Sequence, residues 1–207
     1  MIKFSEWLKE KELSEMAVAL EGDWFVKDDL GSTSLLVLEK EWKYIEDLYG
    51  MKLYKSKSSD AWILGNIKDI PDEDKPRFSV TFRIDFKEAN TIGNKFNIKN
   101  LYVVDEVGVS KDNRGFGLAT KMYTYFIKKH KYNILGSDYQ FFGARKLWSK
   151  LSRISDLIVD IIDVKHNEIL ETNTKIHHGD LDEEFDKRVW SYDIDKKHIR
   201  LILKDIK

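Results

Sequence analysis

Residues 107–119 constrain the fold of this chain most. They read VGVSKDNRGFGLA, which is an apolar strand, a polar turn and a glycine-spaced loop that opens a helix. Glycine has no side chain to keep an anion from the backbone, and it adopts the positive φ that lets successive N–H groups converge. The following helix carries Leu118, Met122 and Phe126 on one face, so its unpaired N–H groups lie at the loop. The pattern predicts a pyrophosphate-binding loop.

The spacing of the loop discriminates between ligand classes. A nucleoside-triphosphate loop needs Gly-Lys-Ser/Thr, and this tripeptide does not occur in the chain. A dinucleotide fold needs Gly-x-Gly-x-x-Gly directly after the strand and an acid about 20 residues later. Gly115, Gly117 and Thr120 nearly fit, with Asp138 as the acid, but the polar residues 111–114 separate strand from glycines. A nucleotide-binding α/β protein therefore stays as the weaker alternative.

A third pattern fits the loop better. Arg114, Gly117 and Ala119 form Arg-x-x-Gly-x-Ala, preceded by Val-Gly-Val-Ser and followed by the helix. This resembles the acyl-coenzyme A signature of the GNAT N-acetyltransferase superfamily, and the resemblance covers roughly residues 77–152. It implies an acyl-CoA-dependent N-acyltransferase that uses acetyl-CoA and acts on a small-molecule or peptide amine. The cofactor-binding residues that it implies are Val107, Val109, Arg114, Gly115, Phe116, Gly117, Leu118 and Ala119.

Acetyl transfer to an amine requires a base that removes a proton from the amine. The candidates for this base are Asp105 and Glu106, two carboxylates in an otherwise apolar strand. Period-two alternation places Asp105 with Val107 and Glu106 on the opposite face. The resemblance implies a base on this strand at or just before Asp105, so Asp105 is preferred. Both carboxylates also fit a simple role as solvated rim residues. The helix position where the superfamily has a tyrosine near the thioester is Trp148 here, and an indole cannot protonate a thiolate.

Composition limits the remaining function classes. The 207 residues include 35 basic and 36 acidic residues, so no charge excess points to nucleic acid. Cysteine is absent, which excludes disulfides and thiolate chemistry and favours a cytoplasmic protein. No apolar run is long enough to predict a membrane span. A homo-oligomer is compatible with these features.

The first 22 residues differ from the rest. Apolar residues at helical spacing predict an amphipathic helix that ends at Gly22 and packs on the domain. Two Leu-x-Glu tripeptides, at residues 8–10 and 13–15, also resemble the cleaved capsid-targeting segments of tailed-phage internal head proteins. We therefore expect two parts, residues 1–22 and a single domain over 23–207. The alternative function is an inactive GNAT-like structural protein in a phage virion, bound to phage head proteins.

The remaining pattern predicts an α/β (α+β) fold with a mixed, mostly antiparallel sheet. Residues 78–86 alternate as a strand that pairs antiparallel with 101–109, and 132–135 close a parallel βαβ unit. A strand at 35–38, a helix at 39–48, a strand at 61–64 and a loop at 90–97 are also expected, as is a helix carrying Ala144, Leu147, Trp148 and Leu151. C-terminal strands over 156–205 include 157–164, a return strand at 168–170, and a hairpin of 190–194 with 199–203.

The histidines indicate no metal site. His177 and His178 lie in a loop with four acidic residues, but adjacent histidines cannot easily face one ion. His130, His166 and His198 are expected at a helix end, a turn and a strand start, with nothing to group them. A Gly-x-Ser-x-Gly nucleophile elbow does not occur either.

Overall fold

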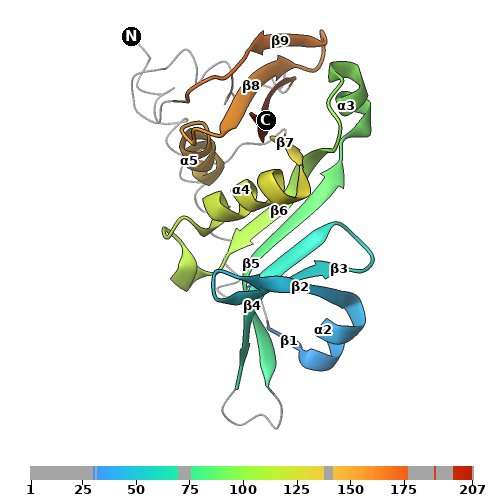
Figure 1. Cartoon of the computed structure of the whole chain (residues 1–207), viewed down its shortest axis with the longest axis vertical. Helices are drawn as coiled ribbons and strands as arrows, with labels where there is room; N and C mark the ends of the chain where they lie inside the picture. Colours follow the sequence, from blue (N-terminus) through green and yellow to red (C-terminus); the bar gives the residue numbers. More distant parts are fainter. Residues whose placement is uncertain are drawn as a thin grey trace, which may run out of the picture.

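The computed structural model describes residues 30, 32–69, 76–137, 142–176, 189 and 198–206. Within this part of the chain the strands form one open, ten-stranded sheet in the order β2-β3-β4-β5-β6-β7-β10-β8-β9, with β1 added beside β5. All pairings are antiparallel except that between β6 and β7. Figure 1 shows the long, twisted sheet with β2–β5 at one end and β8–β10 at the other. The expected α+β class with a mixed, mostly antiparallel sheet is confirmed.

The strands are β1 (Ser32–Ser34), β2 (Trp42–Leu48), β3 (Met51–Ser56), β4 (Ala61–Lys68), β5 (Arg77–Glu88), β6 (Leu101–Val109), β7 (Asn133–Leu135), β8 (Leu157–Asp163), β9 (Glu168–Glu171) and β10 (Ile199–Asp205). The helices are α2 (Leu35–Glu41), α3 (Asn90–Phe96), α4 (Leu118–His130) and α5 (Phe142–Leu151), with a 3-10 turn, η1, at Lys111–Asn113.

The centre of the sheet follows the sequence pattern. Along β5 every second side chain is buried, from Phe78 to Phe86, and the intervening polar ones are half-buried. The antiparallel pairing of β5 with β6 is confirmed, as is the parallel pairing of β6 with β7. Helix α4 makes the crossover between β6 and β7. The predicted βαβ unit is therefore present.

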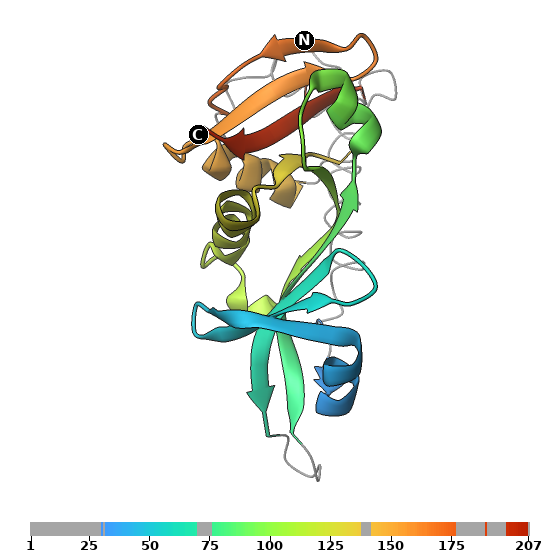
Figure 2. The same ribbon diagram turned by 45° about the vertical axis from the view of Figure 1, so that its right-hand side comes forward.

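Helices α4 and α5 lie side by side on one face of the sheet (Figure 2), and they enclose the main core. That core holds Phe82, Ile84 and Phe86 from β5 together with Met122 and Phe126 from α4. A second cluster packs α3 against β6, β7, β8 and β10. A third lies between α2 and strands β4 and β5. The main core fixes α4, and with it the loop that precedes α4.

The expectations for residues 35–48 are wrong. The predicted strand at 35–38 is part of α2, whose first turn is capped by the Ser34 hydroxyl accepting from the Val37 N–H at 3.4 Å. The predicted helix at 39–48 is mainly β2, which pairs with β3. A register shift between Tyr44 and Glu46 interrupts the period of two in β2. The three-residue spacing of Trp42, Ile45 and Leu48 therefore does not mark one helical face, because Ile45 and Leu48 pack on the main core and Trp42 packs on the third cluster.

Two further expectations need correction or lie outside the described residues. The predicted loop at 90–97 contains α3, which ends at Asn97 in the left-handed conformation with φ 54°. The return strand after 157–164 is confirmed as β9, and β10 forms where the last strand was expected. Strand β10 pairs with β8 and β7, whereas its predicted hairpin partner at 190–194 lies outside the described residues, as does the predicted helix at 1–22. No helix of the described part is both long and apolar enough to cross a membrane.

Glu46 joins the sheet to α4. Its carboxylate accepts from Lys129 Nζ at 2.5 Å and from the Tyr125 hydroxyl, and these two hydrogen bonds hold the pKa of Glu46 below its usual value of 4.5. Because the folded pKa is lowered, the stabilisation is complete above about pH 4.5 and is lost as the pH falls through the folded pKa.

We expect Glu46→Gln to lower the free energy of unfolding by about 1 kcal/mol near neutral pH. The difference from the wild type should shrink towards zero below the folded pKa. Urea unfolding of both proteins over a pH series measures this gap. Glu41→Gln, which removes an exposed carboxylate at the end of α2, is the matched control. A gap that stays constant on acidification would contradict the assignment.

Candidate ligand pocket

A pocket of about 430 Å³ lies between the end of β6, the glycine loop, the first turn of α4, and α5. All of the predicted cofactor-binding residues except Phe116 line it. Phe116 is 77% exposed and does not line the pocket. The pocket thus joins the strand end and the glycine loop to α5, a helix that begins more than twenty residues after the loop.

The glycine loop has a backbone that favours glycine at two positions. Gly115 has φ 82° and Gly117, the N-cap residue of α4, has φ 76°. A Cβ atom at either position would meet no other atom within 4 Å, so the conformation, not crowding, selects glycine. As a glycine, the N-cap residue Gly117 makes no side-chain hydrogen bond to the first turn of α4. The loop therefore presents backbone N–H groups and the positive end of a helix to open space.

Hydrogen bonds fix the loop to the end of β6. Arg114 donates from Nε to the Val109 carbonyl at 3.0 Å, and Asn113 donates from Nδ2 to the Ser110 hydroxyl at 2.9 Å. The Ser110 N–H donates to the Thr81 carbonyl on β5 at 2.9 Å. These bonds hold the loop without occupying the first turn of α4.

Strand β6 leaves its neighbour β7 before it reaches the pocket. The two pair only from Leu101 to Val103, and β6 continues to Val109 with β5 as its partner. Within the described residues, no strand pairs with this last part of β6 on the β7 side. Among the described residues this backbone is therefore an unpaired strand edge, which can accept an extended ligand arm as an added strand.

A β-bulge at Asp105 interrupts the alternation expected for β6. Glu106 pairs with Asp85, and Val104 pairs with Phe86, so Asp105 has no partner in the register. As a result both Val104 and Val107 pack on the main core, whereas regular alternation would separate them. The grouping of Asp105 with Val107 by period two does not hold across this bulge.

The two carboxylates proposed as bases do not line the pocket. Asp105 and Glu106 are both exposed, and the Glu106 side chain lies 3.9 Å from the Arg83 guanidinium. Arg83 also pairs with Asp85 at 2.7 Å, on the β5 face opposite the buried Ile84. Glu106 therefore belongs to a surface ion-pair group on the side away from α4. Asp105 remains a predicted base that does not contact the pocket.

Trp148 does line the pocket, from α5, and it is 4% exposed. Tyr123 on α4 lines it too, and it is also 4% exposed. Burial raises the pKa of Tyr123, so the phenol stays protonated and can donate a hydrogen bond. The spacing of four residues from Ala119 to Tyr123 places both on one helix face, which is the signal that identifies Tyr123. Lys146 and Lys150 of α5 add positive charge to the lining.

A scan against models of protein families, a search of curated proteins and a search of solved structures found no match to this chain. The function is therefore inferred from its own residues and from the pocket.

Proposed function

We propose that this protein is an acyl-CoA-dependent N-acyltransferase that transfers an acetyl group to an amine. The observation that supports the proposal most is that a single pocket is lined by seven residues of the acyl-CoA-like signature and strand end, namely Val107, Val109, Arg114, Gly115, Gly117, Leu118 and Ala119. The fold supports it as well, because a strand edge with no partner in the described part of the chain leads to this pocket.

Each part of the pocket suits one part of the proposed ligand. The backbone N–H groups of the glycine loop and of the first turn of α4 would hold the diphosphate. Lys146 and Lys150 would contribute positive charge to the same anion. The edge of β6 beyond Val103 would hold the amide-containing arm through backbone hydrogen bonds. Acetyl-CoA supplies an activated acetyl group, and the chain supplies binding and orientation.

Tyr123 and Asp105 are the residues proposed to handle protons. Tyr123 offers a protonated hydroxyl at the pocket, which would donate a hydrogen bond to a departing thiolate, whereas the Trp148 indole can donate a hydrogen bond but cannot give up its proton. Asp105 is proposed as the base over Glu106, because Glu106 lies close to Arg83 on the other side of the sheet. Since Asp105 does not line the pocket, it would act on the amine through water.

A charge placed at Thr120 tests the proposed site. Thr120 lines the pocket in the first turn of α4, and this turn contains no acidic residue. Thr120→Asp should weaken acetyl-CoA binding about ten- to a hundredfold, because its carboxylate repels the diphosphate. The same carboxylate should stabilise α4 by about 0.3–1 kcal/mol through the helix dipole. Calorimetry measures the first effect and thermal unfolding the second.

The two effects of Thr120→Asp have opposite signs, so loss of binding cannot be attributed to unfolding. Thr120→Asn, which has nearly the same shape without the charge, is the matched control and should bind within a few-fold of the wild type. Wild-type protein that does not bind acetyl-CoA at millimolar concentration would overturn the proposal. Preferential binding of NAD would support the nucleotide-binding alternative in its place.

A second candidate is a GNAT-like domain without catalysis, for example a structural protein of a phage virion. The observation that favours it is the pocket lining, which has Trp148 at the position expected for tyrosine and neither of the candidate carboxylates. Acetyl-CoA binding without thiol release, in the presence of small amines and peptide amines, would support this candidate. Mass spectrometry of the native protein would show whether the segment 1–22 is removed.

A further inference from the structure

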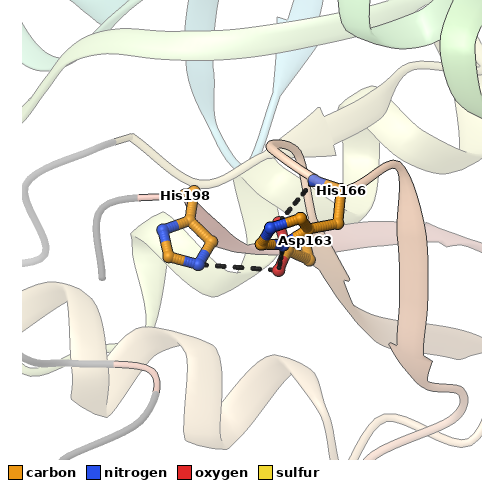
Figure 3. A group of neighbouring side chains, drawn as sticks. All are labelled: Asp163, His166 and His198. Carbon is orange, nitrogen blue, oxygen red and sulfur yellow. Dashed lines mark hydrogen bonds and ion pairs between the residues drawn. The ribbon is translucent and has the colours of Figure 1, made fainter. Parts of the chain in front are cut away.

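Three side chains that the sequence did not group meet at one end of the sheet. Asp163 ends β8, His166 lies in the turn that leads to β9, and His198 directly precedes β10. Figure 3 shows both histidines next to Asp163, with dashed lines marking their interactions with its carboxylate. One ligand atom from each residue lies within 4.8 Å of the other two. The expectation that nothing groups these histidines is therefore wrong.

Strand pairing brings His198 to Asp163. Strands β8 and β10 are antiparallel neighbours, and Ile199 pairs with Asp163. The Val164 N–H donates to the His198 carbonyl at 2.9 Å and extends the ladder beyond the last pair. His166 reaches the same point because the chain turns back into β9. The positions are fixed by backbone hydrogen bonds on both sides.

The geometry centres on one oxygen atom, Asp163 Oδ2. It lies 2.7 Å from His166 Nδ1 and 3.5 Å from His198 Nε2. Donor atoms around a tetrahedral zinc ion, with bonds of about 2.0–2.1 Å, are separated by about 3.3 Å. The observed distances lie on either side of this value. The two imidazole nitrogens lie within 4.8 Å of each other, so side-chain rotations that bring them towards 3.3 Å would place the three donors around one ion.

The carboxylate is already oriented for this role. Asp163 Oδ1 accepts from the N–H groups of Lys165 and His166, both at 2.9 Å, which leaves Oδ2 directed at the histidines. The Asp163 side chain is 8% exposed, so the surrounding protein limits its movement. Metal-binding carboxylates are commonly oriented by such hydrogen bonds. The His166 side chain is 57% exposed and leaves a path from solvent.

We propose that Asp163, His166 and His198 form a binding site for a divalent transition-metal ion of the zinc class. Two imidazoles and one carboxylate suit Zn²⁺, Fe²⁺ and related ions, whereas Ca²⁺ and Mg²⁺ favour oxygen ligands alone. Three protein ligands leave one tetrahedral position for water or another small ligand. His166 would bind through Nδ1 and carry its proton on the exposed ring edge at Nε2. The ion would connect the β8–β9 turn to the start of β10.

The experiment uses tag-free, full-length protein that has been freed of metal with a chelator and dialysed. Calorimetric titration with Zn²⁺ should give one ion per chain at micromolar concentration. Titration with Co²⁺ should give the intense visible absorption of a tetrahedral site. His198→Ala and Asp163→Asn should each weaken Zn²⁺ binding about tenfold or more. The double variant His177→Ser/His178→Ser is the matched control, because it removes the other histidine pair of the C-terminal region.

Thermal unfolding separates loss of the site from loss of the fold. Zn²⁺ should raise the Tm of the wild type and of the control, because it binds the folded state. It should not raise the Tm of His198→Ala, whose unfolding without metal should still be cooperative. Absence of stoichiometric Zn²⁺ binding by the wild type would overturn the proposal, and Asp163 would then be only the capping residue of a turn. Zn²⁺ binding that survives in His198→Ala and is lost in the double variant would overturn it as well.

Discussion

Phe126→Ala is expected to lower the free energy of unfolding by about 3–5 kcal/mol. Phe126 is a fully buried residue of α4. Its ring contacts three other aromatic rings, which come from β4, β5 and the segment before β7. The ring centroids of Trp62 on β4 and Phe86 on β5 lie 5.2 and 4.9 Å away, both edge-on, and that of Tyr132 before β7 lies at 6.0 Å. Alanine would leave a cavity that three rigid rings cannot fill.

Urea unfolding monitored by circular dichroism measures this loss. Phe126→Leu is the matched control. Leucine keeps most of the apolar volume, and its helix propensity is close to that of alanine. It should cost less than about 1.5 kcal/mol. The m-values of all three proteins should agree, since a similar surface is exposed on unfolding. A loss below about 1 kcal/mol for the alanine variant would mean that α4 is not anchored through this ring.

The leucine variant also connects stability to the proposed site. Helix α4 begins at the glycine loop and ends beside Glu46. The contacts of Phe126 with Trp62 and Phe86 hold α4 on the sheet, and they therefore help to set where its first turn lies relative to β6. Because Phe126→Leu should keep this position, its acetyl-CoA binding should stay close to that of the wild type. The core contact and the pocket lie on one helix but act through different residues.

The parts of the fold that were predictable are those whose pattern is local and regular. The alternation in residues 78–86 specifies a strand with one buried face, and the order of strand, loop and helix from 101 to 135 specifies a right-handed parallel unit. Residues 42–48 could not be assigned in the same way. Their apolar spacing reflects a bulge, and only the partner strand β3 reveals it. Helix α3 was missed because Asn and Gly, which favour turns, are tolerated in a helix of seven residues.

In the candidate ligand pocket and the proposed metal site, too, local features were predictable and features that depend on strand pairing were not. The glycine loop and the end of β6 were predictable because their residue types serve the backbone directly. The bulge at Asp105 was not, because it depends on the register with β5. The group of Asp163, His166 and His198 depends on the pairing of β8 with β10, and the two histidines are separated by 31 intervening residues in the sequence. Contacts made by strand pairing leave no periodic signal in a single sequence.

Gly65 illustrates how such a contact constrains a residue, and it carries the second large prediction. The sequence predicts that the strand beginning at Ala61 stops at Leu64, yet β4 continues through Gly65 to Lys68. A register shift with β5 lies between Leu64 and Gly65. A Cβ at Gly65 would lie 2.0 Å from the Ser79 carbonyl oxygen. The glycine therefore marks a close approach of two strands rather than the end of one.

We expect Gly65→Ala to cost about 3 kcal/mol or more, because the obstacle is backbone that can move only if the β4–β5 ladder is disturbed. Gly65→Asn should cost at least as much. Gly50, in the turn between β2 and β3, is the matched control, because it has φ 77° and no atom within 4 Å of a built Cβ. There alanine should cost about 1 kcal/mol, and asparagine less, since it adopts the left-handed conformation more readily.

Gly65 and Gly50 should thus differ in two respects: in how much stability a substitution costs, and in whether alanine or asparagine is the more stable variant. Where conformation selects glycine, asparagine should be tolerated better than alanine. Where space selects it, the larger side chain should be no better, whatever its backbone preference. Urea unfolding of the four variants measures both orders. An asparagine at Gly65 that is clearly more stable than alanine would show that the strands separate easily there, and the close approach of β4 to Ser79 would then not be a constraint on the sheet.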